Sequence, residues 1–413
     1  MSGTTQPPNL GDLHDEQIVA LLRSGAHATL LGAYFGDQEY RELCQYAKLA
    51  ATRADSSGPH VYVLPGIMGS KLGSRGTHAH HIWLHPSAIA SGELLQLALP
   101  DRDGLRASGV MLPGYLKLKL MLEIAGFRVV FFPFDWRRDL LELGRTLLQQ
   151  IEANGHDEVM LVAHSMGGLI ARAALSLAGG RQLTKIVQLG APNAGAFTPV
   201  QALRAVYPTV RKIAALDPHH SAEELARKVF LSLPGLYQLL PAADRSDIDL
   251  FDVNSWPQDE LVPDATLLAN AAATRARLAS ADERCLSIVG VQQETITSIR
   301  RVENDFEYTF MRAGDGTVPL SLAHWEGART WYANENHGGL TRNHTVLAAT
   351  VDLLKSGTTH QLQATRPHAG NEVIRITNDR ELRRQATRKV QWDALSLDSR
   401  RRILEPVLSP EFL

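Results

Sequence analysis

The chain has 413 residues, a formal net charge of −2 and a hydrophobic content of 44%. This length can bury a large core, and one α/β domain with insertions fits it. The balanced charge excludes a strong field that would steer the chain to nucleic acid, so no nucleic-acid partner is expected. Two cysteines are too few for a disulfide framework, and we expect Cys44 and Cys285 to be free thiols in a reducing compartment.

Residues 1–57 are expected to form an N-terminal extension, with helical patterns over 16–23 and 37–51. The first residues lack a basic region followed by an apolar run, which argues against a secretory signal. No apolar stretch of the sequence approaches the roughly 20 residues that span a bilayer. We therefore expect a cytoplasmic protein whose extension packs on the domain that begins at residue 58.

The first core strand is expected over residues 61–64, and it runs into the glycine-rich loop PGIMGS (65–70). Glycine permits tight turns and lets the backbone approach a site closely. A loop of this kind can present a backbone N–H to a developing negative charge, and we select the N–H of Ile67 for that role.

Residues 71–112 form an insertion that is apolar enough to be a lid or a wall facing an acyl chain. Ordinary helical packing explains the same pattern, and the sequence does not decide between the two. The local cluster HAHH (78–81) has no cysteine or carboxylate partners nearby, so we interpret it as a surface loop. We see no metal-ligand spacing and predict neither a metal nor a cofactor.

The next elements alternate between the two regular structures. Helices are expected over 115–124 and 140–153, and strands with unbroken apolar runs over 129–132 and 159–163. Strands that alternate with helices at this spacing predict a mostly parallel central sheet covered by helices on both faces.

The most informative stretch is EVMLVAHSMGGLIA (158–171), in which a short strand meets a helix at Ser165. A strand, a tight turn with a central serine and a helix form the context of a nucleophile elbow. The small residues Ala163 and Gly167 let strand and helix pack closely around the turn. We predict Ser165 as a nucleophile, with the N–H of Met166 as a second donor to an oxyanion.

Another strand is expected over 185–189, and residues 196–280 then show helical patterns without strand signals. An insertion at this point is typical of a cap that shapes a substrate pocket and controls access to it. Six of its apolar residues either line that pocket or fill the core of the cap itself: Leu231, Leu233, Leu236, Tyr237, Leu239 and Leu240.

A serine nucleophile needs a base, and the base needs an acid that orients it. After a strand over 286–291 and a hairpin within 292–312, the loop GDGTVPL (314–320) sets Asp315 between two glycines. Such a loop can point a carboxylate along the sheet edge, and we predict Asp315 as the acid. The alternative is an ordinary Asp-Gly turn in which the carboxylate caps its own backbone.

The predicted base is His337, because its loop follows the strand over 330–333 and precedes a helix that begins near residue 343. The rival is His344, which is expected in the first turn of that helix as a capping or surface residue. The order serine, acid, histidine is that of the α/β-hydrolases.

Residues 356–413 are expected to form a C-terminal extension with helices. Runs of two or three basic residues occur at 383–384, 388–389 and 400–402, with acidic residues between them. A solvated helical face accounts for this pattern. Docking to phospholipid headgroups or to a protein is the alternative.

Several segments occur in the order found in one family and together resemble the lecithin:cholesterol acyltransferase-like α/β-hydrolases, which include lysosomal phospholipase A2. The resemblance covers roughly residues 60–355. It implies an α/β-hydrolase fold, the triad Ser165, Asp315 and His337, and oxyanion donors at Ile67 and Met166. The matching segments are VLPGIMGSKL (63–72), FFPFDWRRDL (131–140), LVAHSMGGL (161–169), LGAPNAG (189–195), SLPGLYQLLP (232–241), GDGTVPL (314–320) and the loop of His337.

The sequence thus predicts an α/β-hydrolase domain over 58–355 that cleaves a lipid ester, such as a phospholipid or an acylglycerol, with transient contact to a lipid interface. Two alternatives stay open. One is an esterase or thioesterase for non-lipid substrates, and the other is a catalytically silent hydrolase fold that serves as a binding or scaffold module. Head group, acyl position and the choice between hydrolysis and acyl transfer depend on pocket shape, which motifs do not encode.

Overall fold

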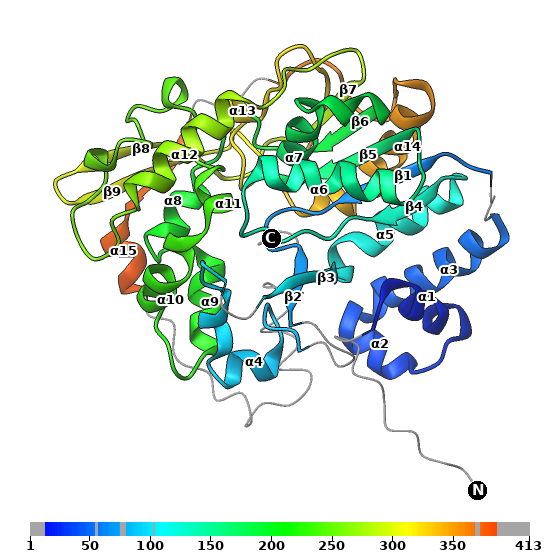
Figure 1. Ribbon diagram of the computed structural model, residues 1–413, viewed down its shortest axis with the longest axis horizontal. Helices are drawn as coiled ribbons and strands as arrows, with labels where there is room; N and C mark the ends of the chain where they lie inside the picture. The colour runs from blue at the N-terminus through cyan, green and yellow to red at the C-terminus, as the bar shows by residue number, and fades with distance from the viewer. Residues whose placement is uncertain (1–12, 54–56, 75–79, 102–103, 368–371, 386–413) are drawn as a thin grey trace, which may run out of the picture.

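The central sheet consists of parallel strands in the order β10-β7-β6-β5-β1-β4 (Figure 1). The computed structural model describes residues 13–53, 57–74, 80–101, 104–367 and 372–385. Most of the sheet's side chains are buried, as expected for apolar runs in a sheet covered on both faces. The strands are β1 (His60–Leu64), β4 (Arg128–Phe131), β5 (Val159–His164), β6 (Leu183–Leu189), β7 (Cys285–Gly290) and β10 (Arg329–Ala333).

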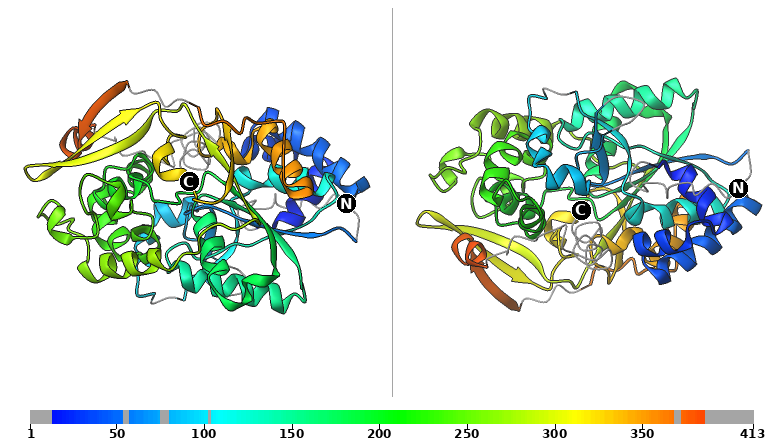
Figure 2. Two further views of the ribbon diagram at one scale, coloured as in Figure 1. Left: turned by 90° about the horizontal axis from the view of Figure 1, so that it is seen from above. Right: turned by 90° about the horizontal axis from the view of Figure 1, so that it is seen from below.

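Helices cover both faces of this sheet (Figure 2). On one face, α6 (Leu140–Ala153) and α7 (Met166–Leu175) pack on each other and share a core with Tyr62 and Leu64. On the other face, α5 (Leu112–Ile124) and α14 (His344–Ser356) share a core with Val61 and Val63. The side chains of successive residues in one strand therefore pack into the cores on opposite faces of the sheet. The predicted α/β-hydrolase fold is confirmed.

The strand order places a topological switch beside β1. The chain passes from β1 to its neighbour β4 and then returns to β5 on the other side of β1. In parallel sheets of this kind, sites form where the carboxyl ends of such strands diverge. The loops after β1 and β5 therefore meet at the edge where a site is expected.

The N-terminal extension forms three helices: α1 (Asp15–Ser24), α2 (Ala28–Phe35) and α3 (Asp37–Arg53). Helix α3 packs against α5, and α1 and α2 pack on α3. Ion pairs fix them there, because the buried Lys117 and Lys119 lie 2.7 Å from Glu42 and 2.5 Å from Asp15. Helix α2 was not predicted, because its apolar run between two glycines carries a weak amphipathic pattern. No described helix is both long and apolar enough to cross a membrane.

The insertion over 71–112 packs on the cap. It contains the antiparallel strands β2 (Ser70–Gly73) and β3 (Arg106–Val110), the helix α4 (Pro86–Ala90) and the 3₁₀ turn η2 (Glu93–Leu97). Helix α4 contacts α9 (Pro208–Leu216), and η2 contacts α10 (Ala222–Lys228). The described part of this insertion therefore supports the packing interpretation over that of an acyl-facing wall.

Residues 196–280 contain helices and no strand, as their patterns predicted. Besides α9 and α10, they form α8 (Thr198–Leu203), α11 (Pro234–Tyr237) and α12 (Ala265–Ala276). Further short elements among the described residues are η3 (Ala178–Gln182), η4 (Phe230–Ser232), η5 (Ala243–Arg245), η6 (Val253–Ser255), α13 (Leu320–Ala323) and η7 (Gly339–Thr341).

A second sheet lies beside the cap at the left of Figure 1. The predicted hairpin is present as β8 (Thr295–Val302) and β9 (Asp305–Met311), and β11 (Val373–Asn378) pairs antiparallel with β9. The expectation of a purely helical C-terminal extension is wrong at β11. Its β-branched run favours a strand, and β9 offers a free edge. The helix α15 (Asp379–Arg384) follows, while residues 388–389 and 400–402 lie outside the described part.

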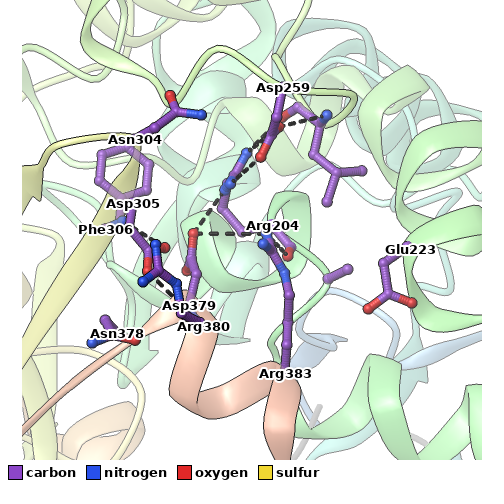
Figure 3. Close-up of polar contacts among 12 residues, drawn as sticks. Arg204, Glu223, Asp259, Asn304, Asp305, Phe306, Asn378, Asp379, Arg380 and Arg383 are labelled. Atoms are coloured by element: carbon purple, nitrogen blue, oxygen red, sulfur yellow. Dashed lines mark hydrogen bonds and ion pairs between the residues drawn. The ribbon is translucent and has the colours of Figure 1, made fainter.

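A buried ion cluster joins α15 to the cap (Figure 3). Arg204, at the end of α8, donates two hydrogen bonds to the carboxylate of Asp259, at 2.8 and 2.7 Å, and one to Asp379, at 2.9 Å. The hydroxyl of Tyr308 on β9 donates to the other oxygen of Asp379 at 2.5 Å. Arg204 and Asp379 are fully buried, so their charges need compensation: Arg204 compensates Asp379, and Arg204 is itself compensated by Asp379 and Asp259 together.

Replacing Asp379 with Ala is expected to lower the free energy of unfolding by about 3–5 kcal/mol, because Arg204 loses a fully buried partner. Denaturant titration at neutral pH measures the change. The matched control is Glu260→Ala, which removes an exposed ion pair with Arg227 and should change stability little. Equal and small losses in the two variants would contradict the structural role of the cluster.

Candidate active site

Ser165 occupies the strained turn between β5 and α7. Its φ of 52° and ψ of −123° lie where residues with a side chain rarely occur, and its side chain makes no capping hydrogen bond. Two glycines make the turn sterically feasible. A Cβ at Gly167 would lie 2.6 Å from the carbonyl oxygen of Pro65, and one at Gly168 would lie 2.4 Å from the Cβ of Ala191. The predicted elbow is therefore present in the backbone.

Asp315 and His337 meet in the interior. The Nδ1–H of His337 donates to Oδ2 of Asp315 at 2.7 Å, and the backbone N–H of His337 donates to the carbonyl of Asp315, also at 2.7 Å. The other oxygen, Oδ1, accepts from the N–H groups of Thr317 and Val318 at 2.9 and 2.7 Å. Asp315 thus caps its own turn and also holds the imidazole of His337, while its role as the catalytic acid stays a prediction.

The hydrogen-bonded pair of Asp315 and His337 is packed against the end of β6. Asp315 and His337 are each 1% exposed. Gly190 has a φ of 60°, and a Cβ there would lie 3.1 Å from both Oδ2 of Asp315 and Nδ1 of His337. A larger residue at Gly190 would therefore push the carboxylate and the imidazole apart.

The second ring nitrogen of His337 is available as a base. With Nδ1–H donating to Asp315, the Nε2 atom carries a lone pair. This atom is buried and has no hydrogen-bond partner among the described residues. Nor is a hydrogen bond formed between it and the hydroxyl of Ser165. Such contacts are often long before substrate binds. By contrast, the rival His344 is exposed and pairs with Glu42 at 2.5 Å.

The predicted oxyanion donors lie at the two loops that meet beside β1. Met166 is the first residue of α7, and the N–H groups of a first helical turn have no intrahelical acceptor. Ile67 borders the same cavity as Ser165. The preceding amide is occupied, because the N–H of Gly66 donates to Tyr115 at 2.8 Å. The arrangement is compatible with donation from Ile67 and not from Gly66.

The cavity beside Ser165 is narrow and apolar, with a volume of about 40 Å³. Of the six cap residues considered above, Leu236 and Leu239 line it, whereas Leu233, Tyr237 and Leu240 are buried in the core of the cap. None of its lining residues comes from 71–112. Nine further lining residues were not predicted, because a helical pattern reveals an apolar face but not what that face packs against. These are Met68, Pro192, Ala196, Thr198, Pro199, Ala202, Tyr207, Thr317 and Val318.

A hydrogen-bonded chain that the sequence did not suggest runs beneath the site. The N–H of Gly66 donates to the hydroxyl of Tyr115, which donates to Nδ1 of His164 at 2.9 Å. The Nε2–H of His164 donates to the carbonyl of His337 at 3.0 Å. These hydrogen bonds link the loop after β1, the elbow and the loop of His337. Residue types gave no signal here, because the partners are distant in sequence.

This series of hydrogen bonds requires neutral His164, because Nδ1 of His164 accepts the hydrogen bond from Tyr115. Burial, followed by repulsion from His337, lowers the pKa of His164 well below its ordinary value. Below about pH 6.5, the unfolded chain binds a proton that the native state cannot bind. Stability is therefore complete above that pH and falls as the pH falls, by up to about 1.4 kcal/mol per pH unit from this residue.

We expect His164→Gln to show a shallower pH dependence of stability than the native protein. Urea denaturation of both proteins between about pH 7 and pH 5 measures the two slopes, and all other titrating groups are common to both. The difference in unfolding free energy between the native protein and His164→Gln should become smaller as the pH falls towards about 5. Parallel slopes would show that His164 is not held neutral.

Within the described ranges, no group of three or more histidine, cysteine, aspartate or glutamate residues could hold a metal ion. In the HAHH cluster, His80 contacts Glu93 at 2.6 Å and His81 contacts Ser108 at 2.8 Å, while His78 lies outside the described residues. Burial raises the pKa of the Cys285 thiol to about 12. Cys285 and Cys44 are both free.

Comparison with known proteins agrees with this architecture. Residues 64–244 match the family model described as PGAP1-like alpha/beta domain. The fold is that of the α/β-hydrolases. The matched range contains the loop after β1, the elbow and part of the cap, whereas Asp315 and His337 lie beyond it. The finer resemblance to the lecithin:cholesterol acyltransferase-like family stays a prediction.

Solved structures with similar folds include that of the Tle4–Tli4 complex, at 13% identity and a TM-score of 0.46, covering 72% of this chain and 98% of that chain. The mature lipase BlEst2 of Bacillus licheniformis has 12% identity and a TM-score of 0.38, covering 73% and 94%. At these identities, neither likeness bears on substrate or activity. No curated protein matches the chain significantly.

Proposed function

We propose that this protein is a serine acyl hydrolase or acyltransferase that acts on a lipid ester. Ser165 is the nucleophile, His337 the base and Asp315 the residue that orients it. The observation that carries the proposal is the buried pair of Asp315 and His337, whose free Nε2 atom is the one a serine base needs.

In the proposed reaction, Nε2 of His337 takes the hydroxyl proton of Ser165 as Oγ attacks the ester carbonyl carbon. The carbonyl electron pair moves onto oxygen, where the N–H groups of Ile67 and Met166 hold it. Collapse of this intermediate restores the carbonyl and expels the alcohol, which receives the proton from His337. Water or a second alcohol then attacks the acyl-enzyme by the same steps, and Ser165 regains its proton.

A lipid substrate is supported by the apolar wall of the cavity and by the family resemblance of the motifs. A volume of about 40 Å³ is far below the roughly 300 Å³ at which drug-sized ligand pockets begin. A long acyl chain therefore requires the cap helices, or the side chains of Leu236, Leu239 and Tyr207, to move.

The same small volume favours a second candidate, an esterase for short acyl groups. A short chain would fit beside Ser165 with little movement of the cap. The two candidates share the chemistry of Ser165 and differ in how the specificity constant depends on acyl length.

Acyl-length preference tests the lipid proposal. We expect kcat/KM for p-nitrophenyl esters to rise from acetyl through butyryl and octanoyl to palmitoyl, because each added buried methylene contributes about 0.8 kcal/mol of transfer free energy. Presenting the long esters in micelles should raise the rate further. A maximum at acetyl or butyryl would reject the lipid substrate and support the short-chain esterase, and Ser165→Ala supplies the blank.

A further inference from the structure

Two arginines from different elements converge on one backbone carbonyl, away from the catalytic cavity. Arg172 of α7 and Arg275 of α12 both donate to the carbonyl of Asn193, at 2.8 and 3.1 Å. Arg172 also donates to the carbonyl of Ala279 at 2.9 Å, and Arg275 to that of Gln238 at 2.9 Å. Their principal acceptors are thus neutral main-chain groups.

Neither guanidinium forms an ion pair with a carboxylate of the described residues. Burial lowers the pKa of Arg172 to about 10. Burial and then repulsion from Arg172 lower the pKa of Arg275 to about 10 as well. The fully buried arginines are compensated differently, since Arg137 pairs with two aspartates and Arg204 with two more. Arg172 and Arg275 are half-buried, and two adjacent half-buried cations without an anion are costly unless something else compensates them.

The two arginines lie at a surface depression of about 440 Å³ that is rich in donors. The Nε of Arg275 and the indole Nε1 of Trp325 are buried there without an acceptor among the described residues. Arg172 lies over the ring of Trp325, 5.6 Å from its centre. The rim carries both signs of charge, because exposed Asp244 and Arg245 pair with each other at 3.3 Å and exposed His324 and Glu326 stand nearby.

We propose that this depression binds a phosphate group, either free or as part of a phosphorylated headgroup. A phosphate offers several acceptor oxygens, which match the forked donors of two arginines and an indole N–H. The residues that line this depression do not line the catalytic cavity, so the proposal is independent of catalysis by Ser165.

The elements around this depression also contribute to the catalytic cavity. Arg172 lies two helical turns after Ser165 on α7, and Asn193 follows Pro192, which lines the catalytic cavity. Arg275 binds the cap at Gln238. A phosphate that neutralises both arginines would therefore stabilise the junction between α7, the loop after β6 and the cap.

Calorimetric titration with inorganic phosphate and with glycerol phosphate, against chloride at matched ionic strength, tests the proposal. We expect saturable binding and a raised melting temperature for the native protein with phosphate and not with chloride. Arg275→Met should weaken binding about tenfold or more, because it replaces a charged donor by an apolar side chain of similar length. The control Arg227→Met, at an exposed arginine paired with Glu260, should bind as the native protein does.

Trp325→Phe is the second variant, in case Arg275→Met does not fold. It keeps the aromatic face under Arg172 and removes the indole N–H, so binding should weaken severalfold. Tighter binding of glycerol phosphate than of phosphate would assign the site to a headgroup, and the reverse order to the free anion. Absence of saturable phosphate binding to the native protein, or equal affinity in a folded Arg275→Met or Trp325→Phe variant, would overturn the proposal.

Discussion

Replacing Ser165 with Ala is expected to abolish ester turnover, lowering kcat by about 10⁴-fold to 10⁶-fold. The hydroxyl is the proposed nucleophile, and the oxyanion donors alone retain only a small residual acceleration. Its side chain makes no capping hydrogen bond in the turn, so the fold should persist. Steady-state hydrolysis of p-nitrophenyl esters measures the loss, and circular dichroism confirms that the variant is folded.

His344→Ala is the control for this experiment, because His344 lies on the surface at the start of α14, 2.5 Å from Glu42. Activity of that variant should match the native protein. If Ser165→Ala kept its full esterase activity, another residue would have to be the nucleophile.

Asp315→Asn has the second-largest expected effect, a fall in kcat of about 10³-fold to 10⁴-fold. The position of Oδ1, which accepts from Thr317 and Val318, will hold the amide oxygen of the substituted side chain. The amide nitrogen then faces Nδ1 of His337, which must become an acceptor. The ring proton consequently moves to Nε2, where the base is needed, and His337 can no longer accept the proton of Ser165.

Stability distinguishes a wrong tautomer of His337 from a loss of the fold as the cause of lost activity. The melting temperature of Asp315→Asn should stay close to the native value, because the turn keeps both backbone hydrogen bonds. Asp305→Asn, on the distant hairpin strand β9, serves as the matched control and should retain activity. A loss of less than tenfold in Asp315→Asn would indicate that another acid orients His337.

The parts of the site that the sequence predicted are those encoded locally. The elbow depends on a strand, two glycines and a helix within a few residues of Ser165. Asp315 and His337 each lie in a loop next to a predicted strand, and parallel strands bring such loops to one edge. Motif and topology together were therefore enough to name residues 22 positions apart that hydrogen-bond.

Contacts between distant segments were not predictable in this way. The bond of His164 to the carbonyl of His337 spans 173 positions, and the pairing of Arg204 with Asp379 spans 175. Strand β11 forms because β9 has an open edge, and no local pattern reveals an edge. Likewise, the cap's apolar faces were visible, but only packing decided that Leu236 and Leu239 line the cavity while Leu240 does not.

Intact mass after brief exposure to a fluorophosphonate tests the central claim most directly, because it requires an activated serine and no knowledge of the substrate. The comparison is between the native protein and Ser165→Ala. We predict a single adduct on the native protein and none on the variant. An adduct on both would place the nucleophile elsewhere, and no adduct on a folded native protein would contradict an activated Ser165.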